Sequence, residues 1–241
     1  MRRVAISGMG AISAAGLGAD VLWDAARSGR SGIGPIELPR AMGNRVLIGG
    51  AIPGFDPAEH IDPGVLRTCD PFARYALYAA GEAIRAAGLT EAELRSDRTA
   101  AIIGTGVGGI GTLDEGCSYT FAVPRTMPSS GASQVSIVHG IKGPTFAVAS
   151  ACASGSQAIG MAAMMIKAGV IDRAVVGGAE ACLTPATMRA WEYLRVLSPD
   201  ACRPFSLGRT GMVIGEGAGV FVLESEAALA ARGAAPLAWL A

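Results

Sequence analysis

The sequence has no excess of charge of either sign, because Lys and Arg together number 20 and so do Asp and Glu. Long-range attraction to nucleic acid or to an anionic membrane needs a surplus of positive charge. The sequence also lacks any apolar run near the ~18 residues that a membrane span requires. Composition therefore supports neither nucleic acid nor a membrane as the main partner, and a partner must be recognised by a local site.

Histidine is scarce, and the cysteines show no pairing pattern. The chain has two histidines, and its five cysteines contain no C-x-x-C pair. Neither a zinc site nor a disulfide framework is expected, and a reducing cytoplasm is the simplest compartment. The start, MRRVAISGMGAISAAGLGAD, places arginines before an apolar stretch as a signal peptide does. Glycines interrupt that stretch, however, and a strand followed by a helix fits it better.

Apolar residues are abundant instead. Hydrophobic residues make up 51% of the chain and charged residues 17%, which predicts a large buried core and a subunit that buries further surface against its own copy. The length of 241 residues suffices for one large domain or two small ones. The 34 glycines follow no repeat, which indicates tight turns and close packing.

Strand patterns alternate with helix patterns along the chain. Strands are predicted over 2–10, 44–52, 98–109 (ending in a glycine turn), 143–151, 172–181, 217–224 and 235–241. Helices are predicted over 19–32, 70–89, 153–168, 185–197 and 225–234. This alternation predicts an α/β fold with a largely parallel sheet, and the apolar strands predict helices on both of its faces.

Capping residues mark several of these boundaries. They are Asp20 and Asp70 as N-caps, Pro71 at a first helical position, Gly29 and Gly88 after last helical residues, and Thr90 with Glu93 as a capping box. Residues 112–140 show only weak periodicity and are expected to form a long connection. Such connections in compact domains often carry function.

The turn GTGVGG, residues 104–109, matches the G-x-G-x-x-G pattern of dinucleotide-binding loops and follows a predicted strand. No clear helix is expected after it to hold a pyrophosphate, and no strand ending in an acidic residue follows about 20 positions later. We therefore favour a turn that brings the backbone close to another group over a nucleotide site.

The stretch FAVASACASGSQAIG, residues 146–160, holds the main candidate site. The strand breaks at Ser150, so Cys152 is expected at a helix N-terminus, where unpaired N–H groups and the helix dipole favour the thiolate. The same N–H groups can stabilise an oxyanion formed in acyl transfer. These local features support a nucleophilic role and a packing role for Cys152 equally. The other four cysteines are expected to be buried packing residues.

A thiol hydrolase is the competing enzyme class. Its chain order runs nucleophile, acid, histidine, whereas His60 and His139 both precede Cys152, so the order cannot be completed within this chain. His139 is expected to be structural and in a loop, and His60 to lie on the surface. The helix at 153–168 is apolar on nearly every side, which predicts that it lies in the core.

A series of motifs then resembles the β-ketoacyl-acyl carrier protein synthases, condensing enzymes of thiolase-like fold. In family order they are VAISGMGAIS, IIGTGVGG, HGIKGPTFAVASACASGSQAIG, AVVGGAEACLTP, LRVLSPDACRPFS and GMVIGEGAGVFVLE. The resemblance covers essentially the whole chain as the N-terminal half of such an enzyme, nearest the elongating, nodulation-type branch. It implies one domain over 1–241, a cap segment at about 105–140, and a mixed, mostly parallel five-stranded sheet with helices on both faces.

The resemblance also implies roles for single residues. Cys152 matches the acyl-accepting nucleophile, Val107 a residue that gates the acyl pocket, and Trp191 another acyl-pocket side chain. Two arginines, Arg67 and Arg195, match positions that meet an acidic acyl carrier protein, although an ordinary solvated role is equally supported. Thr68 replaces a usual basic residue beside them.

The chain also departs from the family pattern. Ser206 and Thr210 stand where the family usually has acidic residues, so the ion pairing of those residues is expected to be absent. The family's two catalytic histidines, its lysine and one oxyanion donor lie in the C-terminal half, which this chain does not contain.

The reaction implied is a decarboxylative Claisen condensation in fatty acid or polyketide biosynthesis. An acyl group on Cys152 would be joined to malonyl-acyl carrier protein to give 3-ketoacyl-acyl carrier protein. No metal and no dissociable cofactor is expected, since the carrier brings its own phosphopantetheine, and a homodimer is expected. A truncated, noncatalytic acyl-binding or dimerisation module is the alternative.

Overall fold

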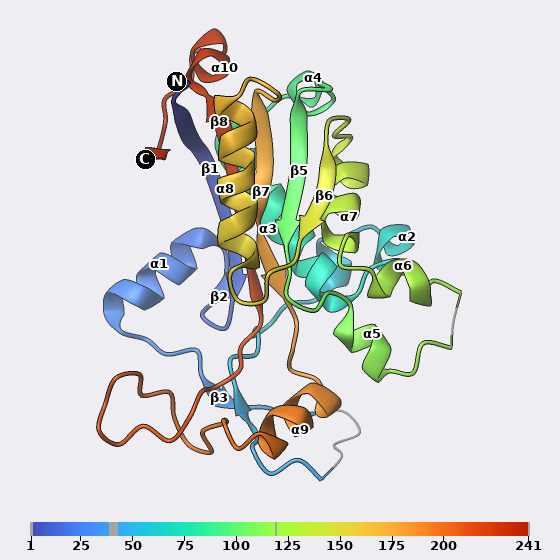
Figure 1. Ribbon diagram of the computed structural model, residues 1–241, viewed down its shortest axis with the longest axis vertical. Helices are drawn as coiled ribbons and strands as arrows, with labels where there is room; N and C mark the ends of the chain where they lie inside the picture. The colour runs from blue at the N-terminus through green and yellow to red at the C-terminus, as the bar shows by residue number, and fades with distance from the viewer. Residues whose placement is uncertain (1, 39–42, 119, 241) are drawn as a thin grey trace.

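A computed structural model describes residues 2–38, 43–118 and 120–240, and its centre is a seven-stranded sheet (Figure 1). The strand order is β2-β1-β8-β7-β5-β6, and β9 pairs with the start of β1. The strands are β1 (Val4–Ser13), β2 (Gly16–Leu17), β5 (Thr99–Gly104), β6 (Thr145–Val148), β7 (Arg173–Glu180), β8 (Gly217–Ser225) and β9 (Ala238–Leu240). Residue 241, the end of the predicted last strand, lies outside the described residues.

The five principal strands form the mixed, mostly parallel sheet that the sequence predicts. β5 pairs in parallel with both β6 and β7, while β8 runs antiparallel to its neighbours β7 and β1. Four of the five therefore point the same way. The count of five was too low, because the free edge of β1 also pairs with the short strands β2 and β9.

Helices cover both faces of the sheet, as predicted (Figure 1). On one face α3 (Pro71–Ala87) packs against β1, β8 and β7, and α7 (Ser130–His139) packs beside it against β5 and β6. On the other face α8 (Ser154–Lys167) packs against β7 and β5. Two buried apolar clusters, one on each side of the sheet, form the core.

The sequence explains how closely α3 approaches β1. The buried face of α3 is largely alanine, and β1 contributes Gly8 and Gly10. A Cβ on either glycine would lie 2.2 Å from a backbone carbonyl oxygen of α3, that of Ala83 or Ala79. The predicted ends of α3 are confirmed, since the Asp70 side chain accepts from Phe72 N and Gly88 is left-handed.

The capping predictions elsewhere are correct except at one position. Gly29 ends α1 (Ala19–Ser28), and Thr90 with Glu93 forms the capping box of α4 (Glu91–Leu94). Asp20 is not an N-cap, because α1 begins at Ala19, two residues earlier than that role requires, and Gly18 takes the cap position. Asp20 instead lies in the first turn, where its charge still favours the helix dipole.

The long connection predicted over 112–140, between β5 and β6, is partly helical. This stretch contains the end of α5 (Ile110–Asp114), α6 (Ala122–Thr126) and α7. Two of these helices have five residues each, too short for an amphipathic period. The third, α7, buries small or polar residues such as Ser130, Gly131 and Gln134, which hides its periodicity.

The predicted strand at 44–52 is reduced to β4 (Ile48–Gly49), which pairs with β3 (Gly34–Pro35). The remaining elements are η1 (Pro57–Glu59), α2 (Pro63–Leu66), α9 (Pro185–Tyr193) and α10 (Glu226–Ala231). None of the helices in the described ranges is long and apolar enough to cross a membrane.

The prediction that the helix at 153–168 is buried all round was also wrong. Only one face of α8 is covered by the sheet, through residues such as Ala158, Ala162 and Ile166. The opposite face exposes apolar side chains, and Met164 is 58% exposed. The apolar composition of α8 indicates apolar surroundings, but it does not show which face of the helix the rest of this chain buries.

Candidate active site at the turn before α8

Cys152 lies in a tight turn between β6 and α8. The turn reverses through Ala151, whose φ of 53° is left-handed, a conformation that usually favours glycine. Cys152 follows directly and is exposed, two residues before the first helical residue of α8. The structure thus places the thiol at the N-terminus of α8, as the sequence predicts.

Ser154 holds this turn together. Its buried Oγ accepts a hydrogen bond from Ser150 N at 2.9 Å and donates to Ala151 O at 2.7 Å. The same Oγ lies 3.2 Å from Thr105 O, in the neighbouring turn. Sequence analysis did not select Ser154. Its hydroxyl stabilises the left-handed Ala151 directly before the thiol, since it bonds the N–H of the preceding residue and the carbonyl of Ala151 itself.

The turn that carries Val107 adjoins the turn that carries Cys152. β5 and β6 are parallel neighbours with Gly104 opposite Val148, so the turns that follow them leave the same edge of the sheet. Thr105 N donates to Val148 O at 3.1 Å. The Val107 side chain is 47% exposed. The structure therefore brings together the segments that carry Cys152 and Val107, the two residues that the family resemblance matches to the nucleophile and to the pocket gate.

Glu180 lies beneath the Val107 turn, at the end of β7. Its carboxylate accepts hydrogen bonds from Thr105 Oγ1 at 3.0 Å and from Gly106 N at 2.5 Å, and the backbone of Val107 also donates to it. Burial raises the pKa of this carboxyl group, and the hydrogen bonds oppose that rise. Sequence analysis missed Glu180, although an acidic residue ending a buried strand, in GGAEA, was a usable signal.

The GTGVGG turn is filled by protein, as the sequence interpretation required. Gly108 has a φ of 67°, and a Cβ on Gly109 would lie 2.1 Å from Arg125 O. The expectation that no helix follows was wrong, because α5 begins at Ile110. That helix has five residues, and the glycines pack against the end of α6 and against Pro128, which follows it. The turn brings the backbone close to other backbone.

The other cysteines differ in exposure. Cys69 is buried, and burial raises its pKa to about 11. Cys182 is half-buried, and burial, reinforced by Glu180, raises its pKa to about 12. Cys117 donates to Thr112 O. The packing prediction is wrong for Cys202, which is exposed in the irregular segment after α9, so Cys152 and Cys202 are the two exposed thiols.

Trp191, Arg67 and Arg195 lie on other surfaces. Trp191 is on α9, which packs against α5. Arg67 ends α2, with its guanidinium 6.0 Å from the Phe121 ring. Arg195 follows α9 in a left-handed conformation and lines a cavity of about 350 Å³ together with Arg45 and Arg189. Within the described ranges, no hydrogen bond or ion pair joins these three predicted site residues to Cys152.

The two histidines lie together at a different place. His60 and His139 line a cavity of about 170 Å³ with Tyr78 and Arg85. His60 is on the surface, as predicted, stacked on Phe55. His139 is not in a loop but ends α7, and burial together with Arg85 lowers its pKa. In this chain, neither histidine is placed beside Cys152.

Thr210, where the resemblance implies an acidic residue, forms polar contacts within its own segment. Its hydroxyl lies 2.6 Å from Ser198 Oγ and donates to Asp200 Oδ1 at 3.1 Å. Arg203 pairs with the same aspartate, and these contacts lower the pKa of Asp200 to about 2. The predicted loss of ion pairing at this position is therefore replaced by a polar network within the segment.

A mixed sheet covered by helices on both faces, with a cysteine on a left-handed strand-to-helix turn, places the chain in the α/β class of folds. Within that class the chain belongs to the β-ketoacyl synthase family, because residues 1–228 match the model of the family's N-terminal domain. The whole chain is 41% identical to nodulation protein E of Rhizobium sp. (strain N33). Over 97% of its length it is 38% identical to 3-oxoacyl-[acyl-carrier-protein] synthase 2 of Staphylococcus aureus (strain COL).

Solved structures agree with this assignment. The ishigamide ketosynthase/chain length factor is 29% identical and superposes on 99% of this chain with a TM-score of 0.92. A β-ketoacyl synthase from Burkholderia phymatum STM815, also 29% identical, gives a TM-score of 0.86 over 99% of this chain. The chain spans 60–62% of the length of the curated relatives named above and 62–63% of these two structures.

Proposed function

We propose that Cys152 is the acyl-accepting nucleophile of a β-ketoacyl synthase. The observation that supports this best is the exposed thiol on the Ala151 turn, at the N-terminus of α8, inside the matched family domain. The thiolate attacks the carbonyl carbon of an acyl-carrier thioester. The new thioester forms on Cys152 as the bond to the carrier sulfur breaks, and the carrier leaves as a thiolate that takes a proton from water.

The second half of the reaction joins two carbon chains. Malonyl-carrier loses carbon dioxide, and the resulting carbanion attacks the acyl carbonyl on Cys152. The carbon–carbon bond forms, the bond to the Cys152 sulfur breaks, and 3-ketoacyl-carrier is released. In this proposal the whole protein acts in fatty acid or polyketide biosynthesis, in the cytoplasm and as a homodimer, without metal or dissociable cofactor. Its carbanion chemistry uses groups outside these 241 residues.

An acyl carrier protein is the proposed partner. A ketosynthase 27% identical to this chain, with a TM-score of 0.78, has been solved in complex with a type II polyketide acyl-carrier protein. Arg67 and Arg195 are exposed cations here and are the proposed contacts, while Val107 and Trp191 are the proposed acyl-pocket side chains.

Intact-mass spectrometry after incubation with acyl-carrier tests the nucleophile. We expect one acyl adduct, mapped by peptide analysis to Cys152 and lost in Cys152→Ala. Cys202→Ser is the matched control, since it removes the other exposed thiol and should leave the adduct in place. An adduct that persists in Cys152→Ala contradicts the assignment.

The same sample separates the enzyme from a noncatalytic module. We expect the 241-residue chain to be acylated but to release no carbon dioxide from malonyl-carrier, measured with carboxyl-labelled malonyl groups. Carbon dioxide release by this chain alone would show that the decarboxylation groups lie within it. Acyl-carrier binding without any adduct would favour the acyl-binding module instead.

A further inference from the structure

The Glu180 carboxylate binds one side of the turn that carries Val107. Its two oxygens accept hydrogen bonds from the Thr105 hydroxyl and from the backbone N–H groups of Gly106 and Val107. The Thr105 hydroxyl in turn accepts from Gly108 N at 3.0 Å. The backbone from 105 to 108 is thus tied, directly or through one hydroxyl, to a single side chain.

The other side of this turn faces the turn of the nucleophile. A Cβ placed on Gly106 would lie 2.9 Å from Glu180 Oε2 and 3.6 Å from Ala151 O. Gly106 therefore adjoins both the carboxylate and the residue that precedes Cys152, with little room for a side chain. The Val107 turn is thus in contact with Glu180 and lies near the turn of the thiol.

The carboxylate is held in place despite its burial. Burial favours its neutral form, yet the four groups that donate to it, the Ala181 backbone among them, favour the charged form. A buried N–H that loses its acceptor is left unsatisfied. The turn therefore depends on Glu180 for its conformation.

We propose that Glu180 is a positioning residue that determines which acyl groups reach Cys152, by fixing the Val107 turn beside the thiol. This inference rests on the proposed function, in which Val107 gates the acyl pocket. Glu180 acts through the turn and not on the reacting atoms. With the turn anchored, Val107 restricts long acyl chains; with the anchor weakened, Val107 moves aside and long chains are admitted more readily.

The test compares the acylation of Cys152 by acetyl-carrier and by dodecanoyl-carrier, followed by intact mass. Glu180→Gln places an amide NH₂ against the backbone donors, and Thr105→Val removes the hydroxyl link while keeping the side-chain shape. We expect each variant to raise the ratio of dodecanoyl to acetyl acylation rates by about tenfold. Glu216→Gln is the matched control, since Glu216 is another carboxyl group whose pKa burial raises, and it accepts from Ile52 N and Tyr75 instead.

The outcomes distinguish this inference from the proposed function. If wild type forms no adduct with either donor, the proposed function fails. If adducts form and the ratio stays at the wild-type value in both variants, the inference fails. Amide hydrogen exchange on wild type gives a check that needs no variant: Gly106 and Val107 should exchange slowly, and fast exchange at these amides contradicts the anchored turn.

Discussion

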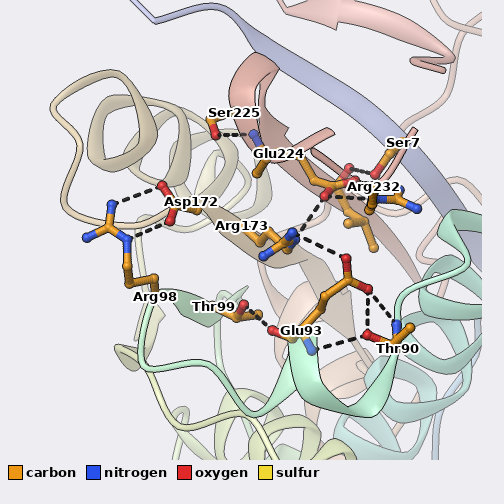
Figure 2. Close-up of polar contacts among 12 residues, drawn as sticks. Ser7, Thr90, Glu93, Arg98, Thr99, Asp172, Arg173, Glu224, Ser225 and Arg232 are labelled. Atoms are coloured by element: carbon orange, nitrogen blue, oxygen red, sulfur yellow. Dashed lines mark hydrogen bonds and ion pairs between the residues drawn. The ribbon is translucent and has the colours of Figure 1, made fainter. Parts of the chain in front are cut away.

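Glu224 is a fully buried carboxylate that owes its stability to two arginines (Figure 2). Arg173 reaches its Oε1 at 2.9 Å and Arg232 reaches its Oε2 at 2.7 Å. Arg173 also pairs with Glu93 at 3.3 Å, the glutamate of the Thr90 capping box. The cluster links β8, β7, α4 and the end of α10. A buried charge is tolerated only when it is paired in this way.

Removing one arginine should therefore be costly. Arg173→Met leaves Glu224 paired with Arg232 alone and removes the ion pair between Arg173 and Glu93. We therefore expect the free energy of unfolding to fall by about 3 kcal/mol. Urea denaturation followed by circular dichroism measures this. Arg203→Met, at the exposed pair with Asp200, is the control and should change stability by less than about 0.5 kcal/mol. Equal effects in the two variants would contradict the buried-pair argument.

The pair of Arg98 and Asp172 predicts a pH dependence. Hydrogen bonds from Arg98 hold the pKa of Asp172 below its ordinary value of 3.8. The stabilisation is therefore present above pH 3.8 and is lost as the pH falls through the lower folded value. We expect Asp172→Asn to lower the urea midpoint at pH 7 and to lose that difference below pH 3.8. If the difference in urea midpoint between wild type and Asp172→Asn instead grows as the pH falls, the predicted pH dependence is contradicted. Asp24→Asn, at an exposed pair, should show little difference at any pH.

At the scale of residues, the sequence located the thiol but not its setting. Cys152 could be placed at a helix start because strand and helix patterns meet there. The sequence could not predict the groups around the thiol, because their positions depend on contacts between segments far apart in the chain. These groups are the left-handed Ala151, the Ser154 hydroxyl and the Glu180 carboxylate. Local pattern carries no information on such pairings.

At the scale of elements, glycine sets the distance between β5 and α8. A Cβ on Gly104 would lie 2.3 Å from the backbone carbonyl of Ser154, so the end of the strand touches the start of the helix. Gly160, in the middle of α8, has no heavy atom within 4 Å of its would-be Cβ. One glycine is required by packing and the other is not.

These two glycines make a matched pair of variants. Gly104→Ala should push the first turn of α8 away from the sheet, lower stability by about 2 kcal/mol and slow acylation of Cys152. Gly160→Ala should leave acylation unchanged and raise stability by up to ~1 kcal/mol, because alanine favours a helix. Thermal unfolding and the mass assay measure both. Slower acylation in Gly160→Ala would contradict this view of the contact.

The helices that were predicted well are those that bury one continuous apolar face under clear caps. α3 shows this, with Asp70 and Gly88 at its ends. The helices over 110–139 were missed because they are short or bury small polar residues against neighbours. The alternation of strand and helix patterns predicted the fold class. It could not predict that the edge of β1 pairs with β9, because β9 lies at the other end of the chain.

At the scale of the whole molecule, the two faces of the sheet are covered unequally. α3 and α7 lie side by side on one face, whereas α8 is the main helix packed on the other face and exposes its own outer side (Figure 1). Met161 and Met164 lie on that outer side, 40% and 58% exposed. Apolar side chains gathered on one helix face favour association with another surface.

This surface predicts concentration-dependent self-association of the 241-residue chain, and substitution at α8 tests it. Met164→Lys removes an exposed apolar side chain and adds one charge, so we expect self-association to weaken about tenfold, the effect of ~1.4 kcal/mol of lost burial. Gln157→Lys adds the same charge at another exposed position of α8 without removing apolar surface, and it should weaken association far less. Sedimentation velocity over a range of concentrations measures both. If the two variants behave alike, charge repulsion and not the apolar face of α8 controls association, and the contact surface must lie elsewhere on the chain.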